Sequence, residues 1–210
     1  MKATLSQFLP LVALVALLTG CAFTKETVAL NYQRPPLGEP VKEEATIAVQ
    51  KLKDARGADP YLLAQKGVYG KTSGAFLTSN EVAVTVTEAL TDTLTGMGCK
   101  VVAEGADLHL GGDLLKFDSS VIVGFWAGSL EGSIQINLKL TNAKTGALLW
   151  SDVISGYSKL TGLQVDRAAH RTAAAEQALQ DAMQKLAASE SFRKVVTHFN
   201  ASPPVPAVTP

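Results

Sequence analysis

Cysteine is scarce in this 210-residue chain, which contains only Cys21 and Cys99. Two cysteines are too few for the disulfide framework of small secreted domains. We expect Cys99 to be a small buried side chain at the start of a strand, and a reactive thiol or an intermolecular disulfide is the functional alternative. The chain is long enough for one domain with a hydrophobic core of its own.

An excess of charge is also missing, because 19 Lys and Arg residues balance 19 Asp and Glu residues. A neutral chain has no basic field that would hold nucleic acid or the head groups of anionic lipids. The composition therefore predicts no nucleic-acid partner.

Recognisable catalytic motifs are absent as well. The chain has no nucleophile elbow, no HExxH zinc motif and no spacing that nominates a Ser/His/Asp set. Gly70–Thr72 resembles the end of a phosphate-binding loop, but the chain has Gln65 where that motif needs a glycine. We therefore predict a protein that is not an enzyme, and an active site assembled only in three dimensions stays open as the alternative.

Metal ligands are few. Asp107, His109 and Asp113 share one face of a predicted strand and could be taken for a metal cluster. Polar residues on one strand face are also typical of a solvated sheet, and zinc would want a further ligand, whereas His170 and His198 lie far away in the sequence. We expect no metal and no other cofactor.

The first 21 residues have the features of an export signal. Lys2 supplies a positive charge, Phe8–Leu18 is apolar but too short to span a membrane, and the stretch ends Leu18-Thr19-Gly20-Cys21. That ending resembles the lipobox of bacterial lipoprotein signal peptides. The resemblance implies that residues 1–20 are removed and that Cys21 carries acyl chains, which anchor the protein in a membrane. The alternative is an ordinary secretory signal with a chance cysteine.

The same resemblance implies a location. In enterobacterial-type sorting, an aspartate after the lipidated cysteine retains a lipoprotein at the inner membrane, and this chain has Ala22 there. We therefore expect the outer membrane, with the domain on the periplasmic side.

After the signal, composition divides the chain into three parts. Residues 21–44 contain three prolines and are predicted to form a tether or linker, in which Thr27–Leu30 could add a short edge strand. Residues 45–200 form one predicted domain, and residues 201–210, with four prolines, are predicted to be a disordered tail. Residues 59–79 are rich in glycine and are expected to be a surface loop or an irregular hairpin.

Hydrophobic spacing predicts the elements of the domain. Apolar residues recur every three or four positions from Val82 to Met97 and again over residues 166–188, which indicates two amphipathic helices. Alternation over 107–114 and 133–141 indicates strands, with a bulge near Gly111-Gly112. After a hairpin loop at 142–146, residues 147–157 are expected to return as the next antiparallel strand. The expected fold is α+β, an antiparallel sheet of about four to six strands with two amphipathic helices packed on one face.

Residues 121–128 are apolar where a turn between two strands should be polar. Val123, Phe125 and Trp126 are therefore candidate contacts for a partner or for the bilayer interface, since exposed apolar patches mark contact sites and Trp suits such interfaces. The equal alternative is a long hairpin whose tip folds back onto the core.

Several motifs occur together in this chain: the lipobox, the strand over 46–52 that ends in Asp54-Ala55-Arg56, the helix with Ala89–Leu94, and the stretches Gly98–Val101 and Ala106–Leu110. Together they are similar to the YajG-like family of uncharacterised bacterial lipoproteins. The resemblance implies an outer-membrane lipoprotein with a periplasmic α+β domain, and it carries no catalytic residues.

These observations lead to two expectations about function. The first is a non-enzymatic envelope lipoprotein, held in the bilayer through Cys21, that acts as a binding or assembly module for an envelope protein. The second is an accessory lipoprotein that carries or hands over a lipidic ligand in envelope transport, using an apolar cleft.

Overall fold

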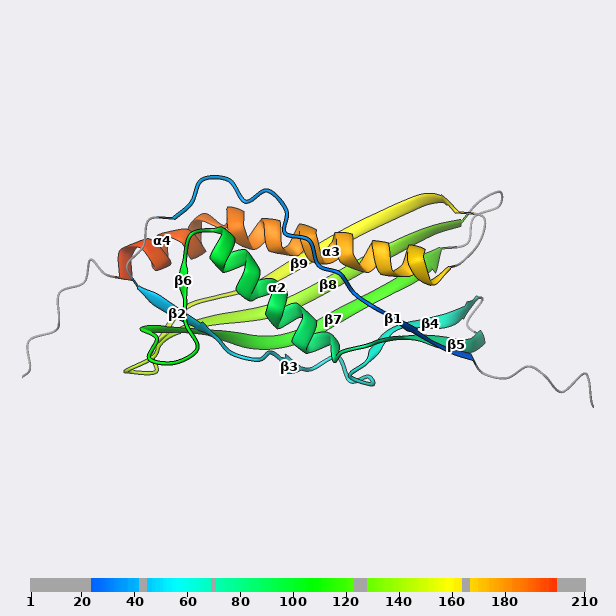
Figure 1. Ribbon diagram of the computed structural model, residues 1–210, viewed down its shortest axis with the longest axis horizontal. Helices are drawn as coiled ribbons and strands as arrows, with labels where there is room; N and C mark the ends of the chain where they lie inside the picture. The colour runs from blue at the N-terminus through cyan, green and yellow to red at the C-terminus, as the bar shows by residue number, and fades with distance from the viewer. Residues whose placement is uncertain (1–23, 42–44, 69–70, 123–127, 164–166, 200–210) are drawn as a thin grey trace, which may run out of the picture.

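The computed structural model describes residues 24–41, 45–68, 71–122, 128–163 and 167–199 (Figure 1). Its strands are β1 (Thr24–Val28), β2 (Thr46–Val49), β3 (Lys53–Asp54), β4 (Leu62–Val68), β5 (Lys71–Thr78), β6 (Lys100–Val101), β7 (Leu108–Ile122), β8 (Gly128–Asn142) and β9 (Leu148–Leu163). Its helices are α2 (Val82–Gly96), α3 (Ala168–Ala188) and α4 (Glu190–His198).

The strands form two sheets. The larger sheet has the order β6-β2-β7-β8-β9, with β3 beside β7, and the smaller sheet has the order β1-β5-β4. In Figure 1 the long strands β7, β8 and β9 run along the molecule, with α2 and α3 packed on the larger sheet. This arrangement confirms the predicted α+β class.

The expectation of a purely antiparallel sheet was wrong. β7–β8 and β8–β9 are antiparallel, but β2 pairs in parallel with β6 and β7, β3 with β7, and β1 with β5. Between β2 and β6 the chain passes through the small sheet and α2, and a long crossover of this kind returns the chain in the parallel direction. The irregular hairpin expected within residues 59–79 is confirmed as β4–β5, which has two register shifts.

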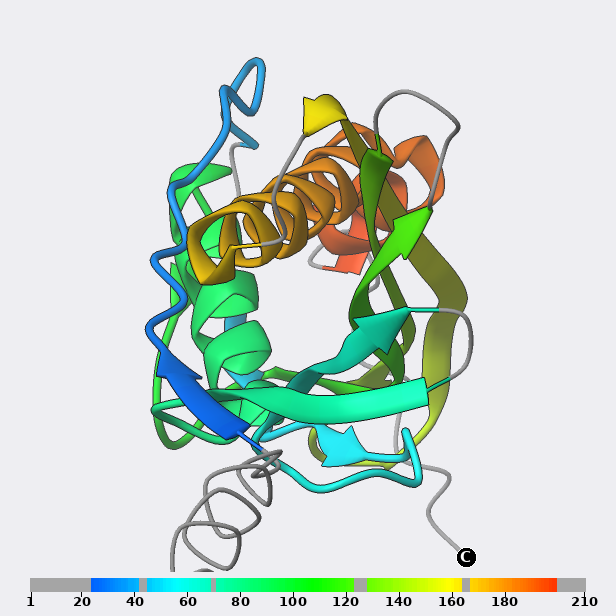
Figure 2. The ribbon, with the colours of Figure 1, turned by 90° about the vertical axis from the view of Figure 1, so that its right-hand side faces the viewer.

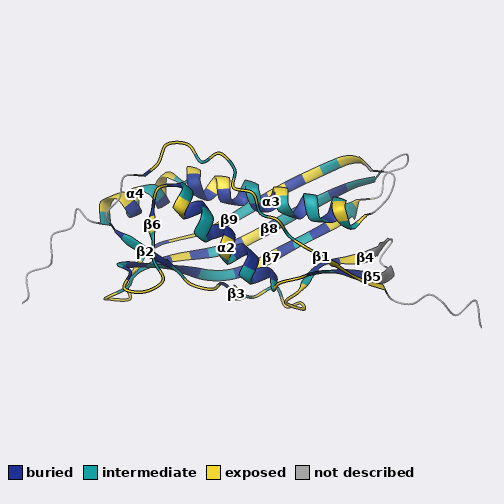
Figure 3. Ribbon diagram, viewed as in Figure 1, coloured by how far each residue is buried: buried dark blue, intermediate teal, exposed yellow. Residues whose placement is uncertain are grey.

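The helical stripes form the core. Val82, Val86, Leu90, Leu94 and Met97 are fully buried, as the spacing predicts, and so is the apolar face of α3 (Figure 3). Cys99 is buried in the core, in agreement with its expected role as a small core residue. The bulge in β7 lies at Leu115 and not at the predicted Gly111-Gly112, because the register against β8 shifts between Leu114 and Lys116.

Small residues let α3 approach the sheet closely. A Cβ atom at Gly132 of β8 or at Gly156 of β9 would collide with the carbonyl oxygen of Ala174 or Ala178, respectively. The Ser158 hydroxyl also donates to the Ala174 carbonyl oxygen at 2.6 Å. The alanine-rich face of α3 therefore lies directly on the sheet backbone, where a larger side chain has no room.

Residues 24–41 follow the surface of the domain, although they fall within the tether predicted over 21–44. Val28, Leu30, Tyr32 and Leu37 pack against the core, and their apolar side chains recur among polar residues. The Tyr32 hydroxyl is 2.9 Å from Thr93 Oγ1, and burial raises the pKa of Tyr32. Asn31 and Val41 contact the domain through their backbone N–H groups, and Arg34 does so through its side chain. Leu37 and Glu39 accept hydrogen bonds at their carbonyl oxygens.

Replacement of Gly156 by valine tests the close packing of α3. The added side chain would have to displace the backbone of α3, so we expect the free energy of unfolding to fall by about 1–3 kcal/mol. Denaturant unfolding measures the change. Ser151→Ala, at an exposed position of the same strand, is the control and should change stability by less than about 0.5 kcal/mol. An equal loss in both variants would contradict this packing.

Candidate functional site

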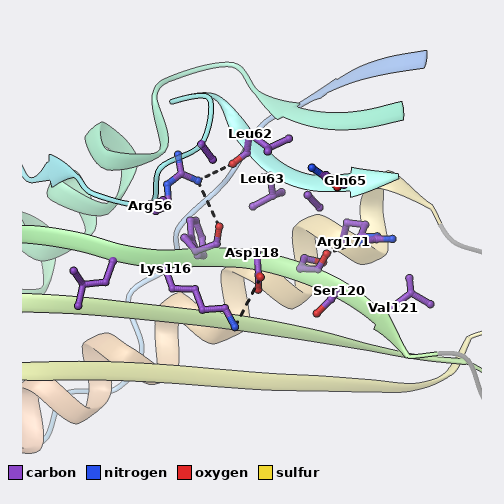
Figure 4. A pocket seen from close by; sticks show the side chains of 14 residues that line it. Arg56, Leu62, Leu63, Gln65, Lys116, Asp118, Ser120, Val121 and Arg171 are labelled. Carbon is purple, nitrogen blue, oxygen red and sulfur yellow. Dashed lines mark hydrogen bonds and ion pairs between the residues drawn. The ribbon is translucent and has the colours of Figure 1, made fainter. Parts of the chain in front are cut away.

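A groove of about 430 Å³ separates the two sheets where β4 faces β7. β7 pairs with β2 and β3 on one side only as far as Leu114, and past the bulge its edge is bordered by no strand of its own sheet in the described part of the chain. β4 is likewise the edge strand of the small sheet. The groove therefore runs between two strand edges, and its lining comprises Arg56, Ala58, Leu62–Gln65, Leu115–Val121 and Arg171 (Figure 4).

Arg56 closes one end of the groove. Its guanidinium binds both carboxylate oxygens of Asp54, at 2.9 and 2.7 Å, and donates to the carbonyl oxygens of Leu62 at 2.7 Å and Phe117 at 3.5 Å. It also donates to the carbonyl oxygen of Pro60 at 3.1 Å. Because Arg56 contacts both β4 and β7, it links the two sheets. The bidentate pair fixes the direction of the guanidinium as well as its charge.

The hydrogen bonds from Arg56 lower the pKa of Asp54, and burial opposes them. Since the side chain of Asp54 is only 18% exposed, this ion pair is largely shielded from water. The ionised form of Asp54 is therefore part of the folded structure at neutral pH.

Arg171 reaches the groove from the first turn of α3. It is only 2% exposed, although arginine is seldom fully buried without partners. Its guanidinium donates to the Ser119 carbonyl oxygen of β7 and lies over the ring of Phe76 in β5, 5.4 Å from the ring centroid. Arg171 thus links α3 to both sheets, and the contact with Phe76 is a cation–π interaction.

Ser119 has the one buried side-chain oxygen or nitrogen without a hydrogen-bond partner in the described part of the chain. The residue is 2% exposed and lines the groove. An unpaired buried hydroxyl costs stability, and it requires an explanation such as a bound polar group. The groove thus combines apolar side chains, two strand edges and two guanidinium groups.

Asp107 and Asp113, which the sequence places on one strand face, interact with neighbouring side chains. The Asp107 carboxylate accepts from the backbone N–H and the hydroxyl of Thr46, at 3.1 and 2.9 Å, and these hydrogen bonds lower its pKa. Asp113 Oδ2 lies 3.9 Å from Lys139 Nζ, which makes an ion pair. Within the described ranges, no three His, Cys, Asp or Glu side chains are placed to hold a metal ion.

The candidate site residues from the sequence, Cys21, Val123, Phe125 and Trp126, lie outside the described residues. Val121 lines the groove. Ile122, the next residue, is the last described one before residues 123–127. The sequence reasoning missed Arg56, Ser119 and Arg171. Arg171 had a signal, because it lies four residues before Ala175 on the apolar face of α3, where an arginine must find buried partners.

A sequence model of the family Lipoprotein_16, described as uncharacterized lipoprotein, matches residues 35–197. The chain belongs to this lipoprotein family. The expected membership of an uncharacterised lipoprotein family is thus confirmed, and the narrower resemblance to the YajG-like group stays a prediction. The match supports a membrane-anchored location in the cell envelope. No curated protein is significantly similar to the chain.

A solved structure with a TM-score above 0.5 supports the fold. A Xanthomonas campestris protein of the DUF330 family has a TM-score of 0.60 and 16% sequence identity, over 83% of this chain and 98% of that chain. A minor lipoprotein from Acinetobacter baumannii has a TM-score of 0.42 and 8% identity, over 71% of this chain and 92% of that chain. Among the helices described for this lipoprotein, none has the length and apolar character to cross a bilayer.

The pH dependence of unfolding tests the Asp54–Arg56 pair. The folded-state pKa of Asp54 is lowered below the unfolded value of about 3.9, so its contribution to stability is present above about pH 4 and is lost as the pH falls through the folded pKa. We expect Asp54→Asn to lower the free energy of unfolding by about 1.5–3 kcal/mol at pH 7. The difference from wild type should shrink in acid.

Arg56→Gln and the double variant complete the comparison. Because both substitutions break the same ion pair, their effects at pH 7 should be less than additive. A loss that is the same at pH 7 and pH 3, or fully additive effects, would contradict this role of the pair.

Proposed function

We propose that this lipoprotein is anchored in the outer membrane through acylated Cys21 and acts as a non-enzymatic binding or assembly module on the periplasmic side. The lipobox-like ending before Cys21, the residue Ala22 that follows it and the family membership support the anchor and the location. Two or more acyl chains give stable membrane attachment.

The groove between β4 and β7 carries the binding role. It runs along seven residues of β7, Leu115–Val121, and this length suits an extended segment of a partner protein. Backbone edges on both sides offer polar contacts, while the half-buried Leu62 and the exposed Leu115 supply apolar ones. Peptides are commonly recognised by such a mixture of backbone edges and side-chain pockets.

The other long strand edge is less suited to a partner. Two side chains of α3 bind backbone groups of β9. The Asp181 carboxylate accepts from the Tyr157 backbone N–H at 2.9 Å, and Lys185 donates to the Ser155 carbonyl oxygen at 3.1 Å. Asp152 accepts from the Val153 N–H at 2.7 Å. Charged side chains that cover an edge strand in this way oppose the addition of a further strand.

A lipidic ligand is the second candidate for the groove. The apolar lining could contact an acyl chain. The groove volume of about 430 Å³ is within the range of small-molecule sites.

The anchor is tested by Cys21→Ser. Without the thiol there is no acyl attachment, so we expect incorporation of a fatty-acid analogue to be lost and the protein to leave the membrane fraction. Cys99→Ala is the matched control, because Cys99 is buried in the core, and it should keep both the label and the membrane location. Membrane association of Cys21→Ser equal to that of wild type would contradict the anchor.

The groove is tested by Ser120→Trp, which places a large ring at an exposed position of its lining. We expect recovery of an envelope protein partner by in-cell cross-linking to fall at least about tenfold, which corresponds to about 1.4 kcal/mol. Ser151→Trp, on an exposed part of β9, is the control and should bind as wild type does.

Native mass spectrometry of the same two variants separates the candidates. Co-purified lipid that is lost only in Ser120→Trp would favour the lipidic ligand. If neither protein recovery nor lipid occupancy differs between the variants, the groove is not the binding site.

A further inference from the structure

β1 fixes the start of the folded domain close to the proposed anchor. Its residues Thr24–Val28 pair in parallel with Gly74–Thr78 of β5. The strands meet so closely at Thr24 that a Cβ atom at Gly74 would collide with the Thr24 carbonyl oxygen. The chain is therefore part of a sheet from Thr24 onward.

The chain that follows β1 is also bound to the surface of the domain. The Asn31 backbone N–H donates to Glu176 Oε1 at 2.6 Å, and Arg34 pairs with Asp92 at 3.5 Å. At the end of the stretch, the Val41 N–H donates to the Met97 carbonyl oxygen at 2.7 Å. Residues 24–41 are thus held against α2 and α3 and do not lengthen the connection to the membrane.

Chain length then limits the distance to the bilayer. Thr24 is the third residue after Cys21, so the two Cα atoms are at most about 11 Å apart. A flexible tether over residues 21–44 would instead have an average end-to-end distance of about 25 Å. The polar head-group region of a bilayer is itself several ångströms thick, at roughly 5–8 Å on each side.

The same end of the domain carries the tip of β7. Lys25 of β1 is paired with Ala75 of β5, which is paired with Gln65 of β4, and Gln65 lines the groove together with Val121. In Figures 1 and 2 the start of β1, the end of β7, the start of β8 and the end of β9 lie at one end of the long axis, and α4 lies at the other. Ile122 at this end is 47% exposed.

We propose that this end of the domain, formed by the start of β1 and the tip of β7, lies against the lipid bilayer. The inference rests on the proposed acylation of Cys21 and adds a fixed orientation to it. The long axis of the domain then points away from the membrane, with α4 distal. The Gln65–Val121 end of the groove opens next to the bilayer, so a segment or ligand that enters there comes from a membrane-bound partner or from the membrane itself.

Two exposed apolar residues make a matched pair of probes. Ile122 faces Ser129 at one end of β8, and Leu148, which is 59% exposed, faces Thr141 at the other. These positions are about 40 Å apart along the strand. Ile122→Cys and Leu148→Cys are each made in the full acylated protein, labelled with a fluorophore and reconstituted into phosphatidylethanolamine/phosphatidylglycerol vesicles that contain a lipid-attached quencher. The parent protein, in which Cys99 is buried, controls for background labelling.

We expect quenching at position 122 to exceed quenching at position 148 by at least about threefold. A flexible Gly/Ser insertion of about 12 residues between Phe23 and Thr24 should remove most of this difference, because it restores slack. Protein that does not float with the vesicles would overturn the anchor, and the orientation with it. Protein that floats but is quenched equally at both positions, or more at 148, would overturn the orientation alone.

Discussion

If Cys21 carries the proposed acyl chains, the parallel pairing of β1 with β5 is the interaction that fixes this lipoprotein close to the bilayer. The pairing begins at Thr24, three residues after the proposed lipidation site Cys21, and Gly74 permits the close approach of the two backbones. A sheet interaction at this point removes the freedom that a proline-rich leader would otherwise have. The proposed orientation of the long axis and the proposed opening of the groove next to the bilayer both depend on this constraint.

Two arginines, the half-buried Arg56 and the buried Arg171, join the elements around the groove. Arg56 lies in the loop after β3 and donates to carbonyl oxygens of β4 and β7. Arg171 of α3 contacts both β5 and β7. Guanidinium groups suit this task because their planar donors bind several oxygens at once. The groove lies between the contacts of these two side chains, so the interactions that join the sheets also shape the candidate binding site.

The sequence predicts well the parts of the fold that depend on local periodicity. The stripe from Val82 to Met97, the alanine-rich face of α3 and the β8–β9 hairpin repeat at the spacing of their own elements, and the structure confirms all three. The parallel pairs of β2 and β1 depend on contacts between distant segments, for which local spacing has no signal. Residues 24–41 contain prolines and only short apolar intervals, so their sequence has no pattern that predicts the packing of Leu30, Tyr32 and Leu37. The groove was missed because β4 and β7 meet only through the tertiary fold.

The distance between the domain and the bilayer is the most direct test of the central claim, a lipid-anchored domain without a flexible spacer. Neutron reflectometry of the acylated protein on a supported bilayer measures this distance. The account predicts protein density that begins within about 10 Å of the head groups. A water-filled layer of about 25 Å between the bilayer and the protein would contradict it.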